Sequence, residues 1–341
     1  MKRDKNRWEK SRVGKGGAIL CLAVGMLMLV NGPGSAQGAA KYPTSPVEII
    51  CPFAAGAATD YLSRLMADEL SKKWRVPVNV VNKVGGNTVI GVNAMMTAKP
   101  DGYTLFADST PSSGSQIGLG GLPYDPMSRT FIARAFYVPQ TLICSPDVPW
   151  RSLKDLLEAG KKDPASVVWG AAAGGRGGCD IYMLQIFDAG GIDVPKMRRV
   201  DFTGSATAIN ALGGGHIKLH AASPGAVLPV VTAGKARALA ISSEKRSHLL
   251  PDCPTTRELG FPTADYNFWV GFTGPAGIPE EVIQTVSKTI EEILKDPGMQ
   301  DRLWQRFSGV PAFLGPEAFK KFVQDEGNSI QRLLKLMTGE K

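Results

Sequence analysis

The feature that most constrains the fold of this chain is a repeated order of a short apolar run, a loop of small residues and an amphipathic helix. The first case is VEIICPFAAGAATDYLSRLMADEL, residues 47–70, in which the apolar run ends at Pro52 and a helix pattern begins near Asp60. Apolar side chains recur at the spacing of one helix face from Leu62 to Leu70. Strands that alternate with helices in this way indicate an α/β fold.

The same order recurs along the rest of the chain. We expect strands at residues 47–52, 78–81, 103–107, 138–144, 167–170, 216–221, 236–242 and 268–273, and helices at residues 60–74, 87–97, 152–161, 181–189, 225–233, 280–294, 298–307 and 316–338. The segment 200–215 predicts one more strand, a turn and a short helix. At one helix start, Ser152 and Asp155 have nearly the spacing and chemistry of a capping box.

Several predicted strands end in loops rich in glycine, serine, threonine or alanine that open the next helix. Ligands of open α/β sheets bind beyond the carboxyl ends of the strands. The loops form two groups, residues 54–60 with 108–113 and residues 171–180 with 203–206. Two groups of such loops predict two lobes that face one ligand cleft.

The first forty residues have the layout of an export signal. Residues 2–15 contain seven basic and two acidic residues, residues 18–30 are apolar, and small residues follow as far as Ala40. The apolar run is shorter than the ~20 residues of a membrane-spanning helix. We therefore expect cleavage after Ala36 or Ala40 rather than an uncleaved anchor. Cys21 lacks the preceding small residue of a lipid-modified cysteine.

Removal of this signal changes the meaning of the net charge. The chain has a formal charge of +8, and residues 2–15 supply five of these charges. The remainder of about 300 residues, a length typical of two domains, is nearly balanced. Without a basic run interleaved with aromatic residues, we expect no nucleic-acid partner. We expect a monomer in the periplasm.

Two local patterns resemble sites of chemistry. His216 and His220 are four residues apart, which on a helix could hold a metal ion. They fall in an alternating strand pattern with Lys218 on the same face, which favours a solvated surface. Ser242 and Lys245 fit the S-x-x-K motif of serine–lysine nucleophiles, but the companion motifs are missing. We predict no enzyme activity, no cofactor and no metal.

Anion binding through the backbone is the remaining chemistry. The first N–H groups of a helix lack internal partners and lie at the positive end of its dipole, so a carboxylate is stabilised there. Asp60 would either cap its helix or order the loop 54–58, directly or through a bridging water. Arg176 lies among glycines in the loop 171–180 and would either bind a carboxylate bidentately or point into solvent.

The cysteines after the signal are isolated, with no C-x-x-C spacing. Export to an oxidising compartment permits disulfides, and a chain of this length can also bury free thiols. Both alternatives stay open for Cys51, Cys144, Cys179 and Cys253.

A set of segments resembles a known family. They are YPTSPVEIICPFAAGAATD, AKPDGYTL, SLKDLL, AGKARALAISSEKR, LPDCPTTRELGFP and FWVGFTGPAGIP. They are similar to the receptor proteins of tripartite tricarboxylate transporters, the Bug family, and occur in family order. The resemblance runs from Tyr42 to the C-terminus.

This resemblance implies a two-lobed periplasmic-binding-protein fold, type II-like, with crossing strands and a ligand cleft between the lobes. After the signal peptide (1–40), one lobe would combine 41–137 with 241–341, and the other would be 138–240. The receptor would deliver a small carboxylate to a large and a small integral membrane subunit. The alternatives are a sensor that presents the ligand to a signalling partner and a serine hydrolase.

The resemblance also implies the ligand-binding residues. The first lobe would bind a ligand carboxylate through main-chain N–H groups and ordered water, and the second lobe through its strand-end loops. With the loop around Arg176 included, the predicted site is Phe53, Ala54, Ala55, Gly56, Ala57, Ala58, Thr59, Asp60, Ser109, Thr110, Gly175, Arg176, Gly177, Gly204, Ser205, Ser223, Phe268 and Trp269. Alanines stand at 54, 55, 57 and 58, where the family is richer in glycine.

Overall fold

The structure is a computed structural model, and it describes residues 42–117 and 122–339. The predicted signal peptide, with Cys21 and the two cleavage positions, lies outside the described residues. Among the residues it does describe, every helix is too short or too polar to cross a bilayer.

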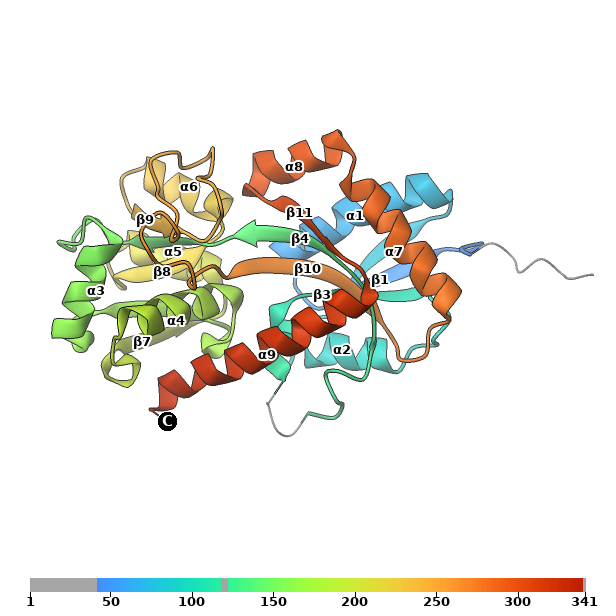
Figure 1. Ribbon diagram of the computed structural model, residues 1–341, viewed down its shortest axis with the longest axis horizontal. Coiled ribbons are helices and arrows are strands. Elements are labelled where there is room, and N and C mark those ends of the chain that lie inside the picture. Colours follow the sequence, from blue (N-terminus) through green and yellow to red (C-terminus); the bar gives the residue numbers. More distant parts are fainter. Residues whose placement is uncertain (1–41, 118–121, 340–341) are drawn as a thin grey trace, which may run out of the picture. The chain divides into compact units, whose positions relative to one another are not determined.

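Strands and helices alternate along most of the chain (Figure 1). The strands are β1 (Val47–Cys51), β2 (Val78–Asn82), β3 (Thr104–Asp108), β4 (Thr130–Pro139), β5 (Thr141–Cys144), β6 (Val168–Ala172), β7 (Arg198–Phe202), β8 (Leu219–Ala222), β9 (Arg237–Ile241), β10 (Asn267–Gly274) and β11 (Val310–Leu314). The helices are α1 (Ala58–Trp74), α2 (Val89–Met96), α3 (Leu153–Lys162), α4 (Gly178–Gly190), α5 (Ser205–Gly213), α6 (Pro224–Thr232), α7 (Glu280–Leu294), α8 (Pro297–Phe307) and α9 (Pro316–Thr338).

The strands of the described residues form two sheets. A six-stranded sheet has the order β11-β4-β10-β3-β1-β2, and a five-stranded sheet has the order β7-β6-β8-β5-β9. Strand β1 is parallel to β2 and β3, and β6 is parallel to β7 and β8, while β10 and β5 add antiparallel pairs. The expected α/β fold, with two sheet-centred lobes, is confirmed.

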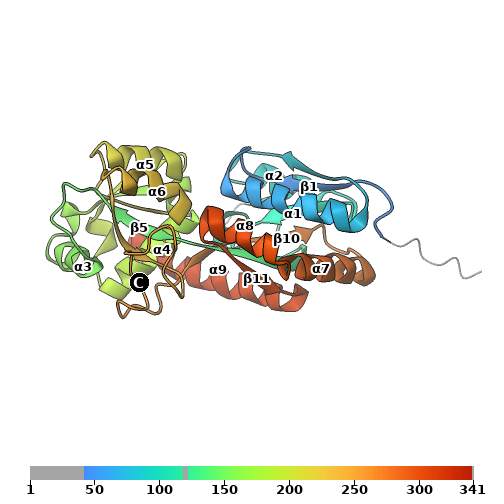
Figure 2. The same ribbon diagram turned by 90° about the horizontal axis from the view of Figure 1, so that it is seen from above.

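Helices cover both faces of each sheet. In the first sheet, Ile49 packs into a core with α1 and α7, and its neighbour Ile50 packs on the opposite face with α2. In the second sheet, Leu142 packs with α3 and α4, and Ile143 packs with α5 and α6 (Figure 2). Because successive strand residues point to opposite faces, the central strands are apolar on both faces, whereas the edge strand β7 is largely exposed.

The chain passes between the sheets at two places. Strand β4 of the first sheet ends at Pro139, and β5 of the second begins two residues later, after Gln140. After β9, the chain returns as β10, which lies antiparallel beside β4 (Figure 1). Helix α9 packs on β4 and also on α4, so it contacts elements of both sheets. These are the expected crossing strands; the residue boundaries of the lobes remain our proposal.

Two predicted strands had wrong bounds, and two strands were missed. The predicted strand 138–144 is broken at Gln140, where the chain changes sheets. Strands β4, apart from its last two residues, and β11 were missed, because their apolar positions depend on antiparallel pairing with distant segments. The predicted strand 216–221 begins only at Leu219.

All four described cysteines are free thiols, and each is buried. Burial raises the pKa of each thiol above its ordinary value. The four cysteines are therefore packed in the protein interior as free thiols and form no disulfides with one another.

Candidate functional site

The predicted ligand loops lie at the carboxyl ends of parallel strands. Strands β1 and β3 are neighbours, with Ile50 opposite Phe106, so the loops that follow them leave the same edge of the first sheet. Strand β6 lies between β7 and β8, so their following loops leave one edge of the second sheet. This is the edge at which α/β proteins bind ligands.

Asp60 orders the first of these loops. Its side chain is 4% exposed and accepts hydrogen bonds from Gly56 N at 2.9 Å and Asn82 Nδ2 at 2.7 Å, and it also binds Arg64 at 2.9 Å. Burial alone raises the pKa of this carboxyl, but the hydrogen bonds from Arg64, Gly56 and Asn82 outweigh burial and lower it. Of the two interpretations offered for Asp60, the geometry matches loop ordering, since the N-cap of α1 is Ala57.

Few backbone N–H groups of this loop and of the start of α1 remain free to donate to a ligand. Gly56 N is bound to Asp60, and Ala57 N donates to Ala54 O at 3.1 Å. The first amides of α1, at residues 58–60, have no acceptor among the described residues. They are therefore the part of the loop that can donate to a ligand.

Asp108 orders the second loop of this lobe, as Asp60 orders the first. One carboxylate oxygen accepts from Ser109 N at 2.8 Å and Ser112 Oγ at 2.6 Å, and the other accepts from Ser113 Oγ at 2.6 Å and Arg129 Nη1 at 3.0 Å. The side chains of Asp108 and Arg129 are both fully buried. The hydroxyl oxygen of Ser109 is also buried but has no hydrogen-bond partner among the described residues.

The hydroxyl of Thr110, in contrast, is hydrogen-bonded to other side chains of the protein. Thr110 Oγ1 is hydrogen-bonded to the hydroxyl of Tyr266 and donates to Glu326 Oε1 at 3.0 Å. Glu326 Oε1 also accepts from Trp269 Nε1 at 2.8 Å. Burial of this carboxyl raises the pKa of Glu326 to about 8, although both hydrogen bonds lower it.

The loop before α4 is the corresponding loop of the second lobe. Asp180 accepts from Ala172 N at 2.9 Å with one oxygen and from Gly177 N at 2.8 Å with the other. Burial raises the pKa of Asp180 to about 7, against the lowering effect of these bonds. Gly174 and Gly175 have φ angles of 67° and 82°, which residues with a Cβ rarely adopt, so this turn requires glycine.

Arg176 is held in this loop by its backbone. Its carbonyl oxygen accepts from Ser115 Oγ at 3.0 Å, which joins the loop to a turn that follows β3. The side chain is half-buried, and its Nε atom is buried without a partner among the described residues. The two alternatives for Arg176, a bidentate bond to a carboxylate and a side chain that points into solvent, both stay open.

The other second-lobe residues also lie at helix starts. Gly204 and Ser223 are the N-cap residues of α5 and α6, and Ser205 is the first residue of α5. Ser205 Oγ donates to Cys179 Sγ at 3.6 Å, so the loop after β7 meets the start of α4. The structure thus brings together the loops around Arg176 and Ser205.

The two predicted aromatic residues point to opposite faces of β10. Phe268 is half-buried and packs against the cores of both sheets, next to Gly178 at the start of α4. Trp269 is fully buried against Phe319 of α9 and donates to Glu326. Because the Trp269 indole is fully buried and its N–H is already bound to the Glu326 oxygen that Thr110 also binds, we leave it out of the site.

The expected solvated face was wrong for His220, whereas His216 is exposed to solvent as expected. His216 lies in a turn, and His220 is fully buried in β8, with its Nδ1 2.8 Å from Gly170 O. Burial lowers the pKa of His220 to about 4. The physical reason is that helices cover both faces of this sheet, so an alternating pattern does not expose every second residue.

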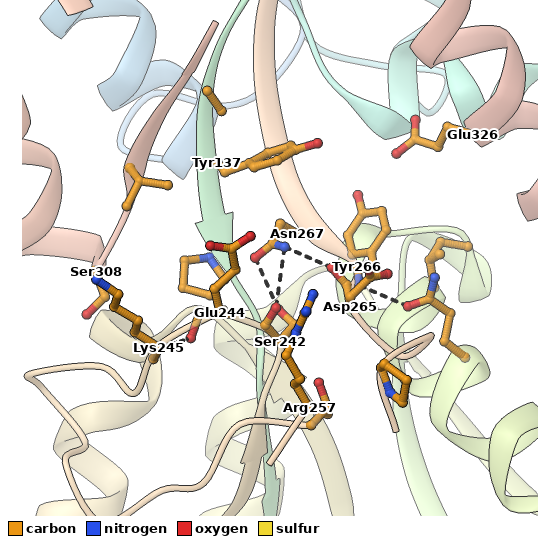
Figure 3. Close-up of a pocket in the computed structure, with 18 of the residues that line it drawn as sticks. Tyr137, Ser242, Glu244, Lys245, Arg257, Asp265, Tyr266, Asn267, Ser308 and Glu326 are labelled. Carbon is orange, nitrogen blue, oxygen red and sulfur yellow. Dashed lines mark hydrogen bonds between the residues drawn. The ribbon is translucent and has the colours of Figure 1, made fainter. Parts of the chain in front are cut away.

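The structure also contains a cavity of about 870 Å³ that none of the predicted site residues lines. Its walls come from α4, α9, β11, the ends of the crossing strands and the segment 242–267 (Figure 3). The sequence offered one signal there, the S-x-x-K motif of Ser242 and Lys245. Ser242 Oγ accepts from Gln140 N at 2.8 Å and donates to Asn267 Oδ1 at 3.3 Å, so it is structural and has no bond to the Lys245 amine.

Comparisons with known proteins agree on one family. The family described as "Tripartite tricarboxylate transporter family receptor" matches residues 62–338. Protein BugT of Bordetella pertussis is 28% identical over 312 residues, which cover 90% of this chain and 94% of BugT. The solved periplasmic binding protein BugD shares 29% identity with a TM-score of 0.72, covering 88% of this chain and 100% of BugD. A protein of R. palustris solved with adipate shares 24% identity with a TM-score of 0.75, covering 87% and 98% of the two chains, and so supports the fold alone.

Proposed function

Because the chain belongs to the tripartite tricarboxylate transporter receptor family, we propose that it captures a small organic carboxylate in the periplasm and delivers it to a transporter of that kind. The transporter partners are a large and a small integral membrane subunit. The protein itself acts as a monomeric receptor and not as an enzyme.

One observation carries this proposal. Two predicted site residues from opposite groups of loops, Ser109 and Arg176, each hold a buried polar atom without a partner among the described residues. Buried polar atoms are normally hydrogen-bonded, and an unmade bond costs about 1–3 kcal/mol. A carboxylate supplies acceptors for both a hydroxyl and a guanidinium, and the free amides at the start of α1 add further donors.

The proposed contacts follow from this geometry. Amides of residues 58–60 and the Ser109 hydroxyl bind one end of the ligand, and Arg176 binds the other. The helix starts at Gly204 and Ser223 and the ring of Phe268 complete the site. The remaining predicted residues of the loop 53–57 position these groups.

The nature of the ligand can be tested by thermal unfolding. The protein is heated with adipate, malate, citrate and hexanoate, each over a range of concentrations. A carboxylate that binds should stabilise the folded state by about 2.7 kcal/mol when it is present at a hundred times its Kd. If no carboxylate raised the unfolding temperature, the proposed function would be contradicted.

The two other functions have separate tests. Genes for transporter membrane subunits beside this gene would support transport, whereas a neighbouring sensor kinase would favour a receptor that signals. A serine hydrolase would be labelled at Ser242 by a fluorophosphonate. We expect no labelling, because Ser242 is 3% exposed and its hydroxyl is hydrogen-bonded to Gln140 and Asn267.

A further inference from the structure

Glu326 of α9 is joined by hydrogen bonds to the loop that follows β3. Its Oε1 atom accepts from the hydroxyl of Thr110, the residue next to Ser109, at 3.0 Å. The same hydroxyl is hydrogen-bonded to that of Tyr266. The Ser109 hydroxyl is one of the groups proposed to bind the ligand carboxylate. A change in the charge of Glu326 therefore acts on a loop of the proposed ligand site.

Tyr266 extends this connection to the second group of ligand loops. A Cβ added at Gly178, the first residue of α4, would lie 2.8 Å from the Tyr266 hydroxyl oxygen, so the tyrosine packs directly on that helix start. A second contact between the two groups of loops is the hydrogen bond from Ser115 Oγ to Arg176 O, at 3.0 Å. The carboxyl group of Glu326 is thus connected to loops of both groups.

The two oxygens of the Glu326 carboxyl group have very different surroundings. Oε1 accepts from Thr110 and also from Trp269 Nε1, at 2.8 Å. Oε2 is buried without a partner among the described residues, and it lies so close to Gly114 that a Cβ added there would overlap it. A buried carboxylate with one bare oxygen is costly, and a proton removes that charge. The geometry fits a neutral carboxyl group whose carbonyl oxygen is Oε1.

The charges around Glu326 do not remove the cost of ionising it. The titratable and charged groups on the elements packed against it are Asp108, Arg129, Arg134, Tyr137 and Tyr266, and α9 itself adds the ion pair of Lys321 with Asp325. Burial raises the pKa of Glu326 to about 8, and the charge of Asp108 adds to this effect. The hydrogen bonds from Trp269 and Thr110 and the charge of Arg134 lower the pKa only in part.

A carboxylate bound at Ser109 adds another negative charge near Glu326, because Ser109 and Thr110 are adjacent in the chain. Like charges in a partly buried site repel each other, so a bound carboxylate and an ionised Glu326 disfavour each other. We propose that this receptor binds its carboxylate together with one proton from solvent, which Glu326 holds in the complex. Glu326 is a positioning residue here, since it acts through Thr110 and does not touch the ligand. The inference rests on the carboxylate receptor function proposed above.

The direction of the pH dependence follows from linkage between the ligand and the proton. In mild acid, Glu326 is already protonated in the free protein, so it adds no pH dependence to the affinity. At higher pH, the free protein loses the proton that the complex must regain, so the Kd rises. If the bound carboxylate makes protonation of Glu326 tenfold more favourable, the Kd rises about eightfold between pH 6.5 and pH 9.5.

Calorimetric titration with adipate over this pH range tests the coupling, with malate, citrate and hexanoate as further probes. Glu326→Gln keeps a carbonyl oxygen for Thr110 and Trp269 but cannot titrate, so it should lose the eightfold rise that the wild type shows. Glu317→Gln is the matched control, because Glu317 is exposed on the same helix and makes no ion pair in the described part of the chain. This control should keep the wild-type pH profile.

The outcomes separate this inference from the proposed function. Binding with the same pH profile in the wild type and in Glu326→Gln would overturn the coupling and leave the receptor function intact. Absence of binding for all four acids would contradict the receptor function, and the coupling would fall with it.

Proton uptake gives a second measurement that does not depend on the Glu326 variant. At pH 8.5, binding enthalpies in Tris and in EPPS, two buffers of different ionisation enthalpy, should indicate an uptake of about half a proton per ligand. Asp180→Asn removes the other carboxyl group of the ligand loops whose pKa is raised toward neutral pH. Uptake that persists in Asp180→Asn supports Glu326 as the proton site, and uptake that disappears there would overturn the proposal.

Discussion

The loops before α1 and α4 are each ordered by an aspartate, but the pKa values of the two aspartates are shifted in opposite directions. In each, an aspartate in the first turn of the helix accepts a backbone N–H from the preceding loop: Asp60 from Gly56, and Asp180 from Gly177 and Ala172. Asp60 is also bound by Arg64, and its pKa is lowered. Asp180 makes no salt bridge among the described residues, and burial raises its pKa to about 7.

An aspartate can therefore order a loop whether or not a cation neutralises its charge. Both loops need a fixed acceptor for backbone N–H groups, which an aspartate supplies whether or not a cation is present. The neighbouring cation decides the pH range in which the aspartate titrates. The first loop should therefore hold its form at neutral pH, while the second is tied to a group that titrates there.

The largest expected effect comes from removing the acceptor of the second loop. Asp180→Ala should lower the free energy of unfolding by about 3 kcal/mol in urea denaturation at pH 6, because two buried N–H groups lose their partner. Asp188→Ala on the same helix is the control, since Asp188 makes only a surface ion pair with Arg332, and it should cost less than about 1 kcal/mol. Equal costs for the two variants would show that Asp180 does not order the loop.

A pH series separates the two aspartates. A folded-state pKa of about 7, raised from 3.8, means that the folded state holds the proton of Asp180 more tightly than the unfolded state. Its contribution to stability is therefore greatest in acid and declines as pH rises toward 7. We expect the free energy of unfolding of the wild type, relative to Asp180→Asn, to fall by about 2 kcal/mol between pH 5 and pH 7.

The difference between the two proteins is the quantity to measure. Glu326, with a raised pKa, and His220, with a lowered pKa, also titrate within or near this range, but they are present in both proteins and cancel. Asp60, whose pKa is lowered, contributes stability that is lost only as pH falls below its ordinary range. A pH-independent difference would mean that Asp180 stays ionised throughout.

Removing the acceptor of the first loop should cost less. Asp60→Ala is expected to lower the free energy of unfolding by about 2 kcal/mol at pH 7, because the loop that it orders is more exposed. Asp68→Ala on the same helix, which is exposed and makes no ion pair among the described residues, should change stability by less than about 0.5 kcal/mol. A cost larger than that of Asp180→Ala would reverse the ranking of the two loops.

The smallest expected effect tests the cation of the second loop. If Arg176 binds the distal carboxylate of a diacid, Arg176→Ala should weaken adipate binding about tenfold more than hexanoate binding, as measured by calorimetry. The two acids have the same carbon chain and differ in one carboxylate. Equal losses for both would remove Arg176 from the distal position.

Local structure was the part that the sequence predicted best. Helix α7 has the predicted bounds, 280–294, because amphipathic spacing follows a proline that ends the preceding loop. The capping box at α3 is confirmed, with Asp155 N donating to Ser152 Oγ at 3.2 Å and Ser152 N donating to Asp155 Oδ2 at 2.9 Å. Each of these features depends on residues within a few positions of one another.

Local patterns failed to predict strands that depend on contacts between distant segments. Strand β4 contains Arg134, which argues against a buried strand when it is read locally. In the structure its guanidinium lies over the rings of Tyr137 and Phe322, 4.1 and 4.5 Å from their centroids. Phe322 is on α9, far along the chain, so no local pattern could indicate this partner.

The sequence by itself determined the α/β order, the family and the loops at which helices begin, because short-range spacing encodes helices, strands and caps. Only the tertiary structure decided which groups in those loops are free. It directs the hydroxyl of Thr110 to Glu326, 216 residues away, and leaves that of Ser109 unpaired. It also assembles the cavity beside the crossing strands from distant segments. Hydrogen bonds and burial between distant residues depend on packing, which local spacing does not contain.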